Sequence, residues 1–341
     1  MKKLLFLFAP AALLIQACSN DFDVTAPWKE IPVVYGILYP KDTAHYIRVE
    51  KAFLDPETNA LTIAQIADSL YYPKDAIDVY LKPANGGQQI KLERVDGNLE
   101  GYVRKGGIFA THPNWLYKTK APLAEGVKYQ FIMTRADGKP DVTAETTIPS
   151  QFRFSTPNPV DIPPRITFIP DAPTSVEWRT DVNGVFFAVH FRIRYREVFP
   201  DGKVVNDTLY WTPVTNVKRA GSPSGAGGLY RGIASIPAET FFSFLVKNNP
   251  TAGNDQIRYF DGIDITIEGG GGEIEKYLDA AAANAGLTGA EVVPSYSNIS
   301  EGFGLFTAKT SLTLEKVQVQ KPTIEAMNDQ LATKALNFQF F

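Results

Sequence analysis

Alternating apolar and polar residues, interrupted by turn-forming Gly, Asn, Asp and Pro, predict a mainly β protein built from antiparallel sheets. The chain has 341 residues, and domains of about 100–200 residues are usual, so two domains are expected. Five prolines crowd into residues 149–164, a density typical of a stiff linker. We therefore expect two β-sandwich domains of immunoglobulin or transthyretin type, at 30–150 and 165–341, joined by a proline-rich linker at 151–164.

The first domain is expected to consist of strands that pair with their neighbours along the chain. Asn85-Gly86-Gly87 and Asp137-Gly138 supply turns, because glycine accepts the positive φ that tight hairpins need. One short helix is expected at Thr62–Leu70, in a crossover between strands. The expected strands are Ile31–Tyr39, His45–Phe53, Ala76–Leu81, Gln89–Val95, Val127–Met133 and Asp141–Ile148.

The second domain begins with a strand at Arg165–Ile169, and its strongest strand signal is Gly184–Val198. That strand is expected to pair through Asp201-Gly202 with Val204–Trp211. Its odd-numbered residues from Phe187 to Tyr195 are apolar and predict the buried face. Its even-numbered residues include Arg192, Arg194 and Arg196, which we interpret as a solvated face paired with Glu197 and nearby acids.

Short helices are added to the second domain. The start of each expected helix is indicated by a proline in the first turn or by acidic residues there. A proline or a glycine follows the end of two of these helices. The expected helices are Ala238–Asn248, Glu273–Ala285 and Pro322–Leu336. The alternating end of the chain, Leu336–Phe341, is expected to add as a strand to a sheet edge of this chain or of a partner.

The first residues predict a removable leader. Met1–Lys3 is basic and Leu4–Leu14 is apolar, which is typical of a signal peptide and too short for a transmembrane helix. Ile15–Cys18 resembles the lipobox of bacterial lipoproteins, in which the bond before the cysteine is cut and the cysteine is acylated. We expect a signal peptide at 1–17 and a lipidated tether at 18–29; the alternative is an ordinary leader whose cleavage site adjoins a cysteine.

The charge balance and the cysteine count limit the kinds of partner and covalent link that we expect. The leader takes two of the 34 basic residues with it, which leaves 32 against 37 acidic residues. A nucleic-acid-binding protein would normally carry a concentrated basic face, so no nucleic-acid partner is expected. Cys18 is the only cysteine, so no internal disulfide can form.

Catalytic and cofactor motifs are not found, so we expect no enzyme activity, no metal and no cofactor. The three histidines, His45, His112 and His190, are each more simply explained as strand or surface residues than as catalytic groups. Four glycines at Gly269–Gly272 precede a helix with an acidic first turn, which would repel a phosphate, so we interpret them as a flexible loop. A carboxylate-based hydrolase stays open, because the sequence does not fix the separation of any acidic pair.

Aromatic residues are the best indication of recognition. Trp115 and Tyr117 lie in a loop at 108–117 that is rich in aromatics, and Trp211 is a second candidate. These three residues are expected to contact a ligand or partner; the alternative is that they belong to the cores of the sandwiches.

Three Asp-Ser/Thr-apolar triplets resemble the sites at which Bacteroidota attach O-linked sugars to envelope proteins. The resemblance implies glycosylation of Thr43, Ser69 and Thr208.

Several short stretches, together with the lipobox, resemble the DUF4249 family of Bacteroidota lipoproteins. They are Val33–Gly36, Ala76–Leu81, Gly126–Phe131, Thr146–Pro149 and Asn298–Phe306. The resemblance implies an outer-membrane lipoprotein that often acts beside a TonB-dependent transporter or envelope machinery, and it implies no catalytic residues. Asp21 and Asp23 faintly resemble surface-targeting signals and favour the cell surface over the periplasmic face.

We therefore expect a non-enzymatic binding or scaffold lipoprotein, anchored in the outer membrane by lipid on Cys18 and accessory to an outer-membrane protein. One alternative is a surface glycan-binding lipoprotein for nutrient uptake, and another is the carboxylate hydrolase.

Overall fold

The computed structural model describes residues 30–52, 59–224, 227–253, 255–284 and 295–340. The signal peptide expected at 1–17, the tether expected at 18–29 and the lipidation of Cys18 lie outside these residues and stay predictions. None of the helices in the described ranges is long and apolar enough to cross a membrane.

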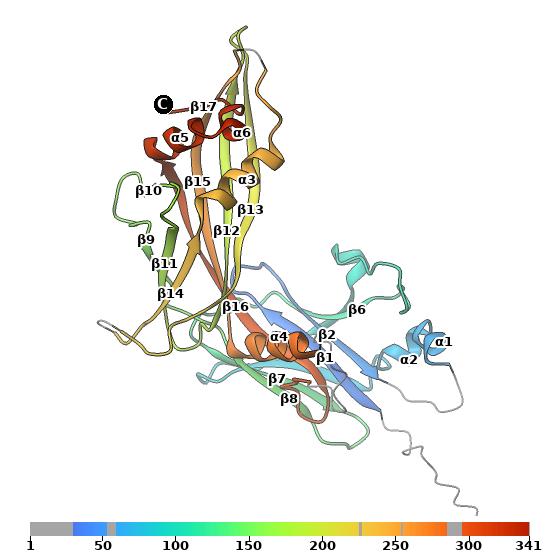
Figure 1. Cartoon of the computed structure of the whole chain (residues 1–341). Helices are drawn as coiled ribbons and strands as arrows, with labels where there is room; N and C mark the ends of the chain where they lie inside the picture. The colour runs from blue at the N-terminus through green and yellow to red at the C-terminus, as the bar shows by residue number, and fades with distance from the viewer. Residues whose placement is uncertain (1–29, 53–58, 225–226, 254, 285–294, 341) are drawn as a thin grey trace, which may run out of the picture.

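The protein is mainly β, as expected, and it consists of two sandwiches stacked end to end (Figure 1). In the first sandwich, two sheets face each other across a core that includes Val34, Ile47, Val79 and Phe131. One sheet has the spatial order β5 (Glu93–Asp96), β6 (Trp115–Thr119), β2 (His45–Ala52), β1 (Ile31–Leu38) and β16 (Phe303–Val319). The other has the order β4 (Ile90–Lys91), β3 (Ile77–Pro83), β7 (Lys128–Arg135) and β8 (Val142–Thr147).

The second sandwich packs its own sheets and helices around a larger core. One sheet has the order β13 (Val204–Lys218), β12 (Phe186–Val198), β15 (Ile257–Gly270) and β16, and the facing sheet has the order β14 (Tyr230–Ile236), β11 (Thr174–Thr180) and β9 (Arg153–Thr156). Helices α3 (Ala238–Asn248) and α5 (Lys321–Asn328) close the far end with buried apolar residues. The predicted apolar face of β12, from Phe187 to Tyr195, is buried in this core.

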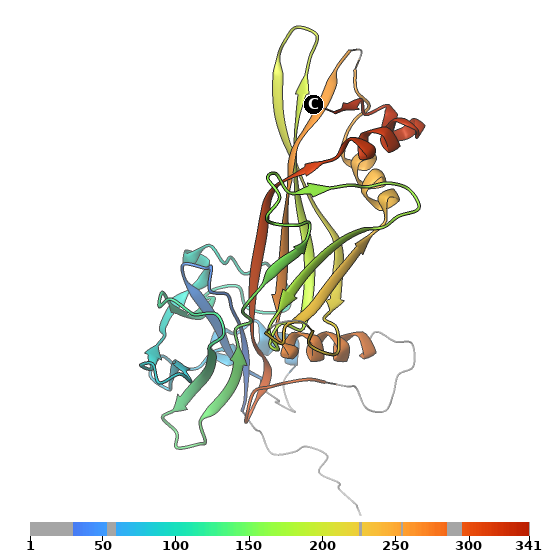
Figure 2. The ribbon, with the colours of Figure 1, turned by 90° about the vertical axis from the view of Figure 1, so that its left-hand side faces the viewer.

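One strand, β16, belongs to both sandwiches (Figure 2). Its first part, Phe303–Ala308, runs parallel to β1, and its later part, from Lys309, runs antiparallel to β15. The two larger sheets are therefore one continuous sheet, and a sandwich confined to 30–150 would lack a strand of its own core. Phe306 and Ala308 are buried in the first core although they lie in the range predicted for the second domain.

The segment before β16 attaches it to the first sandwich. The Asn298 side chain brackets the backbone of Phe306, donating to its carbonyl at 2.7 Å and accepting from its N–H at 2.9 Å. The Ser300 hydroxyl accepts from the Thr143 N–H at 2.7 Å, and the Ser300 N–H donates to the Thr143 carbonyl at 2.8 Å. The stretch Asn298–Phe306 therefore closes the sandwich against β8 and β1.

Several predicted elements are corrected in detail. The helix expected at Thr62–Leu70 is two short helices, α1 (Ala60–Ala64) and α2 (Ala67–Leu70), and the helix expected at Pro322–Leu336 is α5 followed by α6 (Leu331–Lys334). Part of the expected linker forms β9, because 153–156 contains no proline and buries Phe154 against β11. The glycines at 269–272 end β15 and begin α4 (Gly272–Asn284) instead of forming a loop.

The chain end behaves as predicted. β17 (Phe338–Gln339) adds in parallel to β15 of its own sheet, and Phe338 is buried. Arg258 lies at this junction, 1% exposed; it donates to the Glu197 carboxylate at 2.7 Å and to the carbonyls of Pro250 and Leu336. The buried guanidinium therefore ties the C-terminal segment to the sheet. Two-residue β10 (Arg165–Ile166), shorter than expected, pairs with the end of β16.

Candidate functional site

A pocket of about 590 Å³ lies at one side of the first sandwich, between the end of α2 and the pair β5–β6. Its volume is within the range of ordinary small-ligand sites. In Figure 1, α1 and α2 project from the sandwich on the side of β2 and β6. The pocket is lined by Asp68, Tyr71, Tyr72, Pro73, Lys74, Arg94 and Trp115.

Trp115 is the predicted contact residue that lies in this pocket. It begins β6, which corrects the expectation of a loop through residue 117. Its side chain is partly buried and packs against the small cluster of Leu70, Tyr71 and Ala110. The guanidinium carbon of Arg94 lies 4.5 Å from the centre of its ring, a cation–π contact. Because Arg94 lies against the ring, we expect a ligand in this pocket to meet the guanidinium group of Arg94 before the face of Trp115.

Two tyrosines form the wall opposite β5 and β6. Arg104 donates to the Tyr71 hydroxyl at 2.7 Å and to the Glu50 carboxylate at 2.6 Å, so the ring of Tyr71 is held in place. Burial raises the pKa of Tyr71 and that of Tyr72 above the ordinary value of a phenol. Both tyrosines therefore stay neutral, and the charge of the pocket comes from Arg94, Lys74 and Asp68.

The other two predicted contact residues differ in burial: Tyr117 is a core residue, and Trp211 is partly buried against the core of the second sandwich. Tyr117 is 5% exposed and belongs to the core of the first sandwich. It lies on the same side of β6 as Trp115, but unlike Trp115 it pairs with β2 as well as β5 and so lies inside the sheet. Trp211 is stacked on Phe244 of α3, with ring centres 5.1 Å apart, and meets Phe191 edge-on. The second tryptophan candidate therefore fastens α3 to the sheet, and Trp178 is completely buried nearby.

The three hydroxyls predicted for glycosylation lie in different settings. Thr43 is exposed in the turn between β1 and β2. Ser69 in α2 and Thr208 in β13 are partly buried. Thr43 is the most accessible of the three, and glycosylation of each stays a prediction.

The arginine face of β12 is paired with nearby acids, as expected, but these are acids of β15, and Glu197 pairs with Arg258 instead. Asp264 of β15 is 2% exposed and accepts from Arg192 Nε at 2.7 Å, from Arg194 Nη2 at 2.7 Å and from the Lys316 N–H at 2.8 Å. Arg196 pairs with Asp261. Both acids belong to the neighbouring strand β15: Asp264 lies directly opposite Arg192 and is diagonal to Arg194, and Asp261 lies at the register shift beside Arg196.

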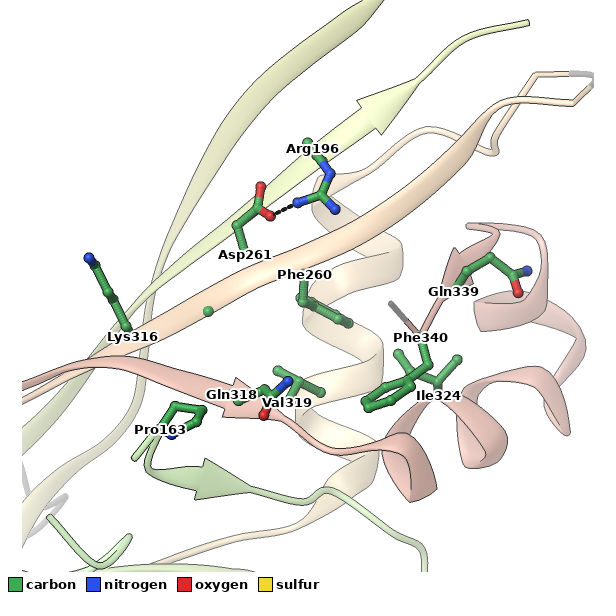
Figure 3. A pocket seen from close by; sticks show the side chains of 11 residues that line it. Pro163, Arg196, Phe260, Asp261, Lys316, Gln318, Val319, Ile324, Gln339 and Phe340 are labelled. Carbon is green, nitrogen blue, oxygen red and sulfur yellow. Dashed lines mark hydrogen bonds and ion pairs between the residues drawn. The ribbon is translucent and has the colours of Figure 1, made fainter. Parts of the chain in front are cut away.

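A second hollow, about 220 Å³, lies where β16 separates from β15 (Figure 3). The Arg196–Asp261 ion pair lies on one side of it, and Ile324 and Phe340 point toward it from the C-terminal segment. Two of its ionic groups, Arg196 and Asp261, are paired with each other, and Lys316 also lines the hollow.

The histidines do not converge on a metal or a base. His190 Nδ1 lies 2.9 Å from the Thr212 hydroxyl, and His112 Nδ1 lies 3.0 Å from the Thr111 hydroxyl. Among the described residues, no group of His, Cys, Asp and Glu side chains could hold a metal ion. His45 is buried at 3% exposure, and its Nδ1 has no hydrogen-bond partner in the described ranges.

We expect His45 to make folding sensitive to mild acid. Burial lowers the pKa of its imidazole, which outweighs the opposing effects of Asp42 and the Ala121 backbone. Since the unfolded chain binds the proton more readily, stability is complete above about pH 6.5 and falls as the pH drops below it. Urea unfolding of His45→Gln between neutral and mildly acidic pH should show a flatter pH dependence than the parent chain. His190→Gln is the control, and an unchanged slope in His45→Gln would contradict the assignment.

The solvent side of the first sandwich carries a cluster of apolar side chains, most of them exposed or partly exposed, that we call the tyrosine face. It surrounds a shallow hollow of about 350 Å³ on β1, β2, β6 and β16. The rings of Tyr46 and Tyr102 lie 4.6 Å apart across it. The face consists of Tyr35, Ile37, Tyr46, Tyr102, Phe303 and Leu305.

Comparison with protein-family models gives no match, and comparison of the sequence with curated proteins gives none either. One similar solved structure is the C-terminal globular domain of the oligosaccharyltransferase of Pyrococcus abyssi, at 13% identity and a TM-score of 0.24. The match covers 71% of this chain and 46% of that one, so the chain spans less than half of that structure. A likeness at this level carries no argument about function.

Proposed function

We propose that the chain is an outer-membrane lipoprotein that acts as a non-enzymatic binding or scaffold module, accessory to a TonB-dependent transporter or an envelope assembly machine. The tyrosine face is the observation that carries the proposal. Its residues Tyr35, Ile37, Tyr102 and Phe303 are between 44% and 52% exposed. Exposed apolar patches on soluble proteins mark interaction sites, and aromatic residues are effective anchors of protein interfaces.

The lipobox-like Ile15–Cys18 supports anchorage beside an outer-membrane partner. The fold begins at Ile31 in β1, a strand of the tyrosine face. At about 3.5 Å per residue, the chain from Cys18 to Ile31 can reach at most about 45 Å. A lipid on Cys18 would therefore keep the tyrosine face close to the membrane surface, where an outer-membrane protein could meet it.

We expect the double variant Ile37→Asp, Tyr102→Asp to lose its partner. Two charges placed in the centre of an apolar interface should lower recovery of the complex at least about 10-fold. The measurement is cross-linking in intact cells, followed by quantification of a stoichiometric outer-membrane protein recovered with the lipoprotein. Ile162→Asp is the matched control, because Ile162 is 96% exposed in the linker and far from the face in sequence. Repeated recovery of the parent chain alone, or equal recovery with the double variant, would contradict the proposal.

The second candidate function is binding of a small ligand or glycan for uptake, and the pocket at Trp115 favours it. The pocket has a volume suited to a sugar ring and combines apolar walls with charged groups. A glycan array is the first test: binding that is lost in Trp115→Ala supports this function, and no binding retires it.

A further inference from the structure

The pocket at Trp115 contains a partly buried cation without an acidic partner. Arg94 lines the pocket, and its Nε is buried with no hydrogen-bond partner among the described residues. The described part of the chain also contains no ion pair to Arg94; its contact is with the ring of Trp115. Removing a charge from water is costly unless a partner compensates, so this arrangement requires an explanation.

The other arginines of the first sandwich show what Arg94 lacks. Arg48 and Arg104 both donate to Glu50, at 2.9 and 2.6 Å. Arg135 donates to Glu30 at 2.7 Å. Arg94 is therefore the exception among the four arginines between residues 30 and 150, and it is also the one that lines a ligand-sized pocket.

The surroundings of Arg94 suit an anion attached to a small ring. The cation–π contact with Trp115 holds the guanidinium over the ring, so its terminal N–H groups are positioned in advance for a carboxylate or phosphate. Lys74 adds a second positive charge at the rim, and Asp68 is the opposing negative charge. The remaining walls, from Tyr71, Tyr72 and Pro73, are mostly apolar and would contact the body of a ring.

We propose that this pocket binds a ring-sized organic anion, a sugar that carries a carboxylate or phosphate group, with the anionic group on Arg94. This inference rests on the second function proposed above, ligand binding, and is independent of the tyrosine face. It names the class of ligand: an acidic sugar is bound more tightly than its neutral counterpart.

The test is calorimetric titration of the purified chain with glucuronate, glucose 6-phosphate and glucose. At least one of the two anions should bind at millimolar concentration, and glucose should bind at least about 10-fold more weakly, because a charge-assisted hydrogen bond is lost. Whether glucuronate or glucose 6-phosphate binds distinguishes a carboxylate from a phosphate ligand. Added salt should weaken binding of the anion.

Variants separate a ligand-binding role of Arg94 from a structural one. Arg94→Met should weaken anion binding at least about 10-fold without lowering the urea midpoint, since the change leaves no carboxylate of the protein unpaired. Arg153→Gln removes the same charge from an exposed position of β9 and should leave binding unchanged.

Three results would overturn the inference. They are no binding of either anion, binding that survives Arg94→Met, and glucose binding as tight as that of the anions. Equal binding of glucose and the anions would contradict the selectivity for acidic sugars but would still support glycan binding. No binding of any sugar, in the titration or on the array, would contradict both proposals. Neither result bears on partner recovery through the tyrosine face.

Discussion

Gly304→Ala is expected to prevent the first sandwich from closing, at a cost of more than about 4 kcal/mol in the free energy of unfolding. Gly304 has a φ of +124°, and a Cβ at this position would lie 1.9 Å from the Val34 carbonyl oxygen and 2.8 Å from its carbon. Both atoms belong to the backbone of β1, so no side-chain rotation can relieve the contact. The parallel pairing of β1 with β16 must therefore break.

Urea unfolding followed by tryptophan fluorescence measures this effect, and two matched glycines separate its causes. Gly101 has a φ of +89° with nothing within 4 Å, so Gly101→Ala should show backbone strain alone, about 1 kcal/mol. Gly107 has open space, and Gly107→Ala should be close to neutral. If Gly304→Ala lowers the free energy of unfolding no more than Gly101→Ala does, the close approach of β1 and β16 at Gly304 is wrong.

Cys18→Ser is expected to remove the protein almost completely from the membrane fraction. Two or three acyl chains anchor a protein firmly, at about 0.8 kcal/mol for each buried CH₂, and the serine variant could carry none of them. Fractionation of cells and mass spectrometry of the purified N-terminal peptide are the measurements. Ser19→Ala is the control, because it changes the neighbouring residue and leaves the thiol in place. A parent chain with a free thiol, or with its leader still attached, would contradict the anchor and the proposed location together.

The strands could be predicted from the sequence wherever one side faces a core. The alternation from Phe187 to Tyr195 identified both the strand and its buried face, and Asp137-Gly138 located the hairpin of β7 and β8. The pairing of β1 with β16 could not be predicted, because strands so distant along the chain leave no local pattern. The second sandwich also begins earlier than expected. The density of prolines predicted a linker at 151–164, but it gave no information on the short proline-free segment that forms β9.

The candidate site could be predicted only in part. A tryptophan next to a proline-containing loop was a sufficient signal for Trp115, but aromatic Tyr117 is a core residue and Trp211 packs partly buried against α3. Trp115 and Tyr117 lie on the same side of β6, and only the part of the strand from Tyr117 onward pairs with β2, so the position of each residue along the strand decides which one reaches the core. Arg94 carried no sequence signal, because the absence of an acidic neighbour becomes visible only when the fold brings Trp115 and the end of α2 together.

The strand shared by the two sandwiches also sets an order of assembly. If the chain crosses the inner membrane from its N-terminus, β1 and β2 arrive long before β16. The first sandwich then keeps an open edge at β1 until residues beyond Ala308 have emerged. An uncovered strand edge is prone to pair wrongly with other chains. In that case the N-terminal half, although it is exported first, would keep an open strand edge for longest. It would then depend on protection by a periplasmic chaperone until β16 pairs with β1.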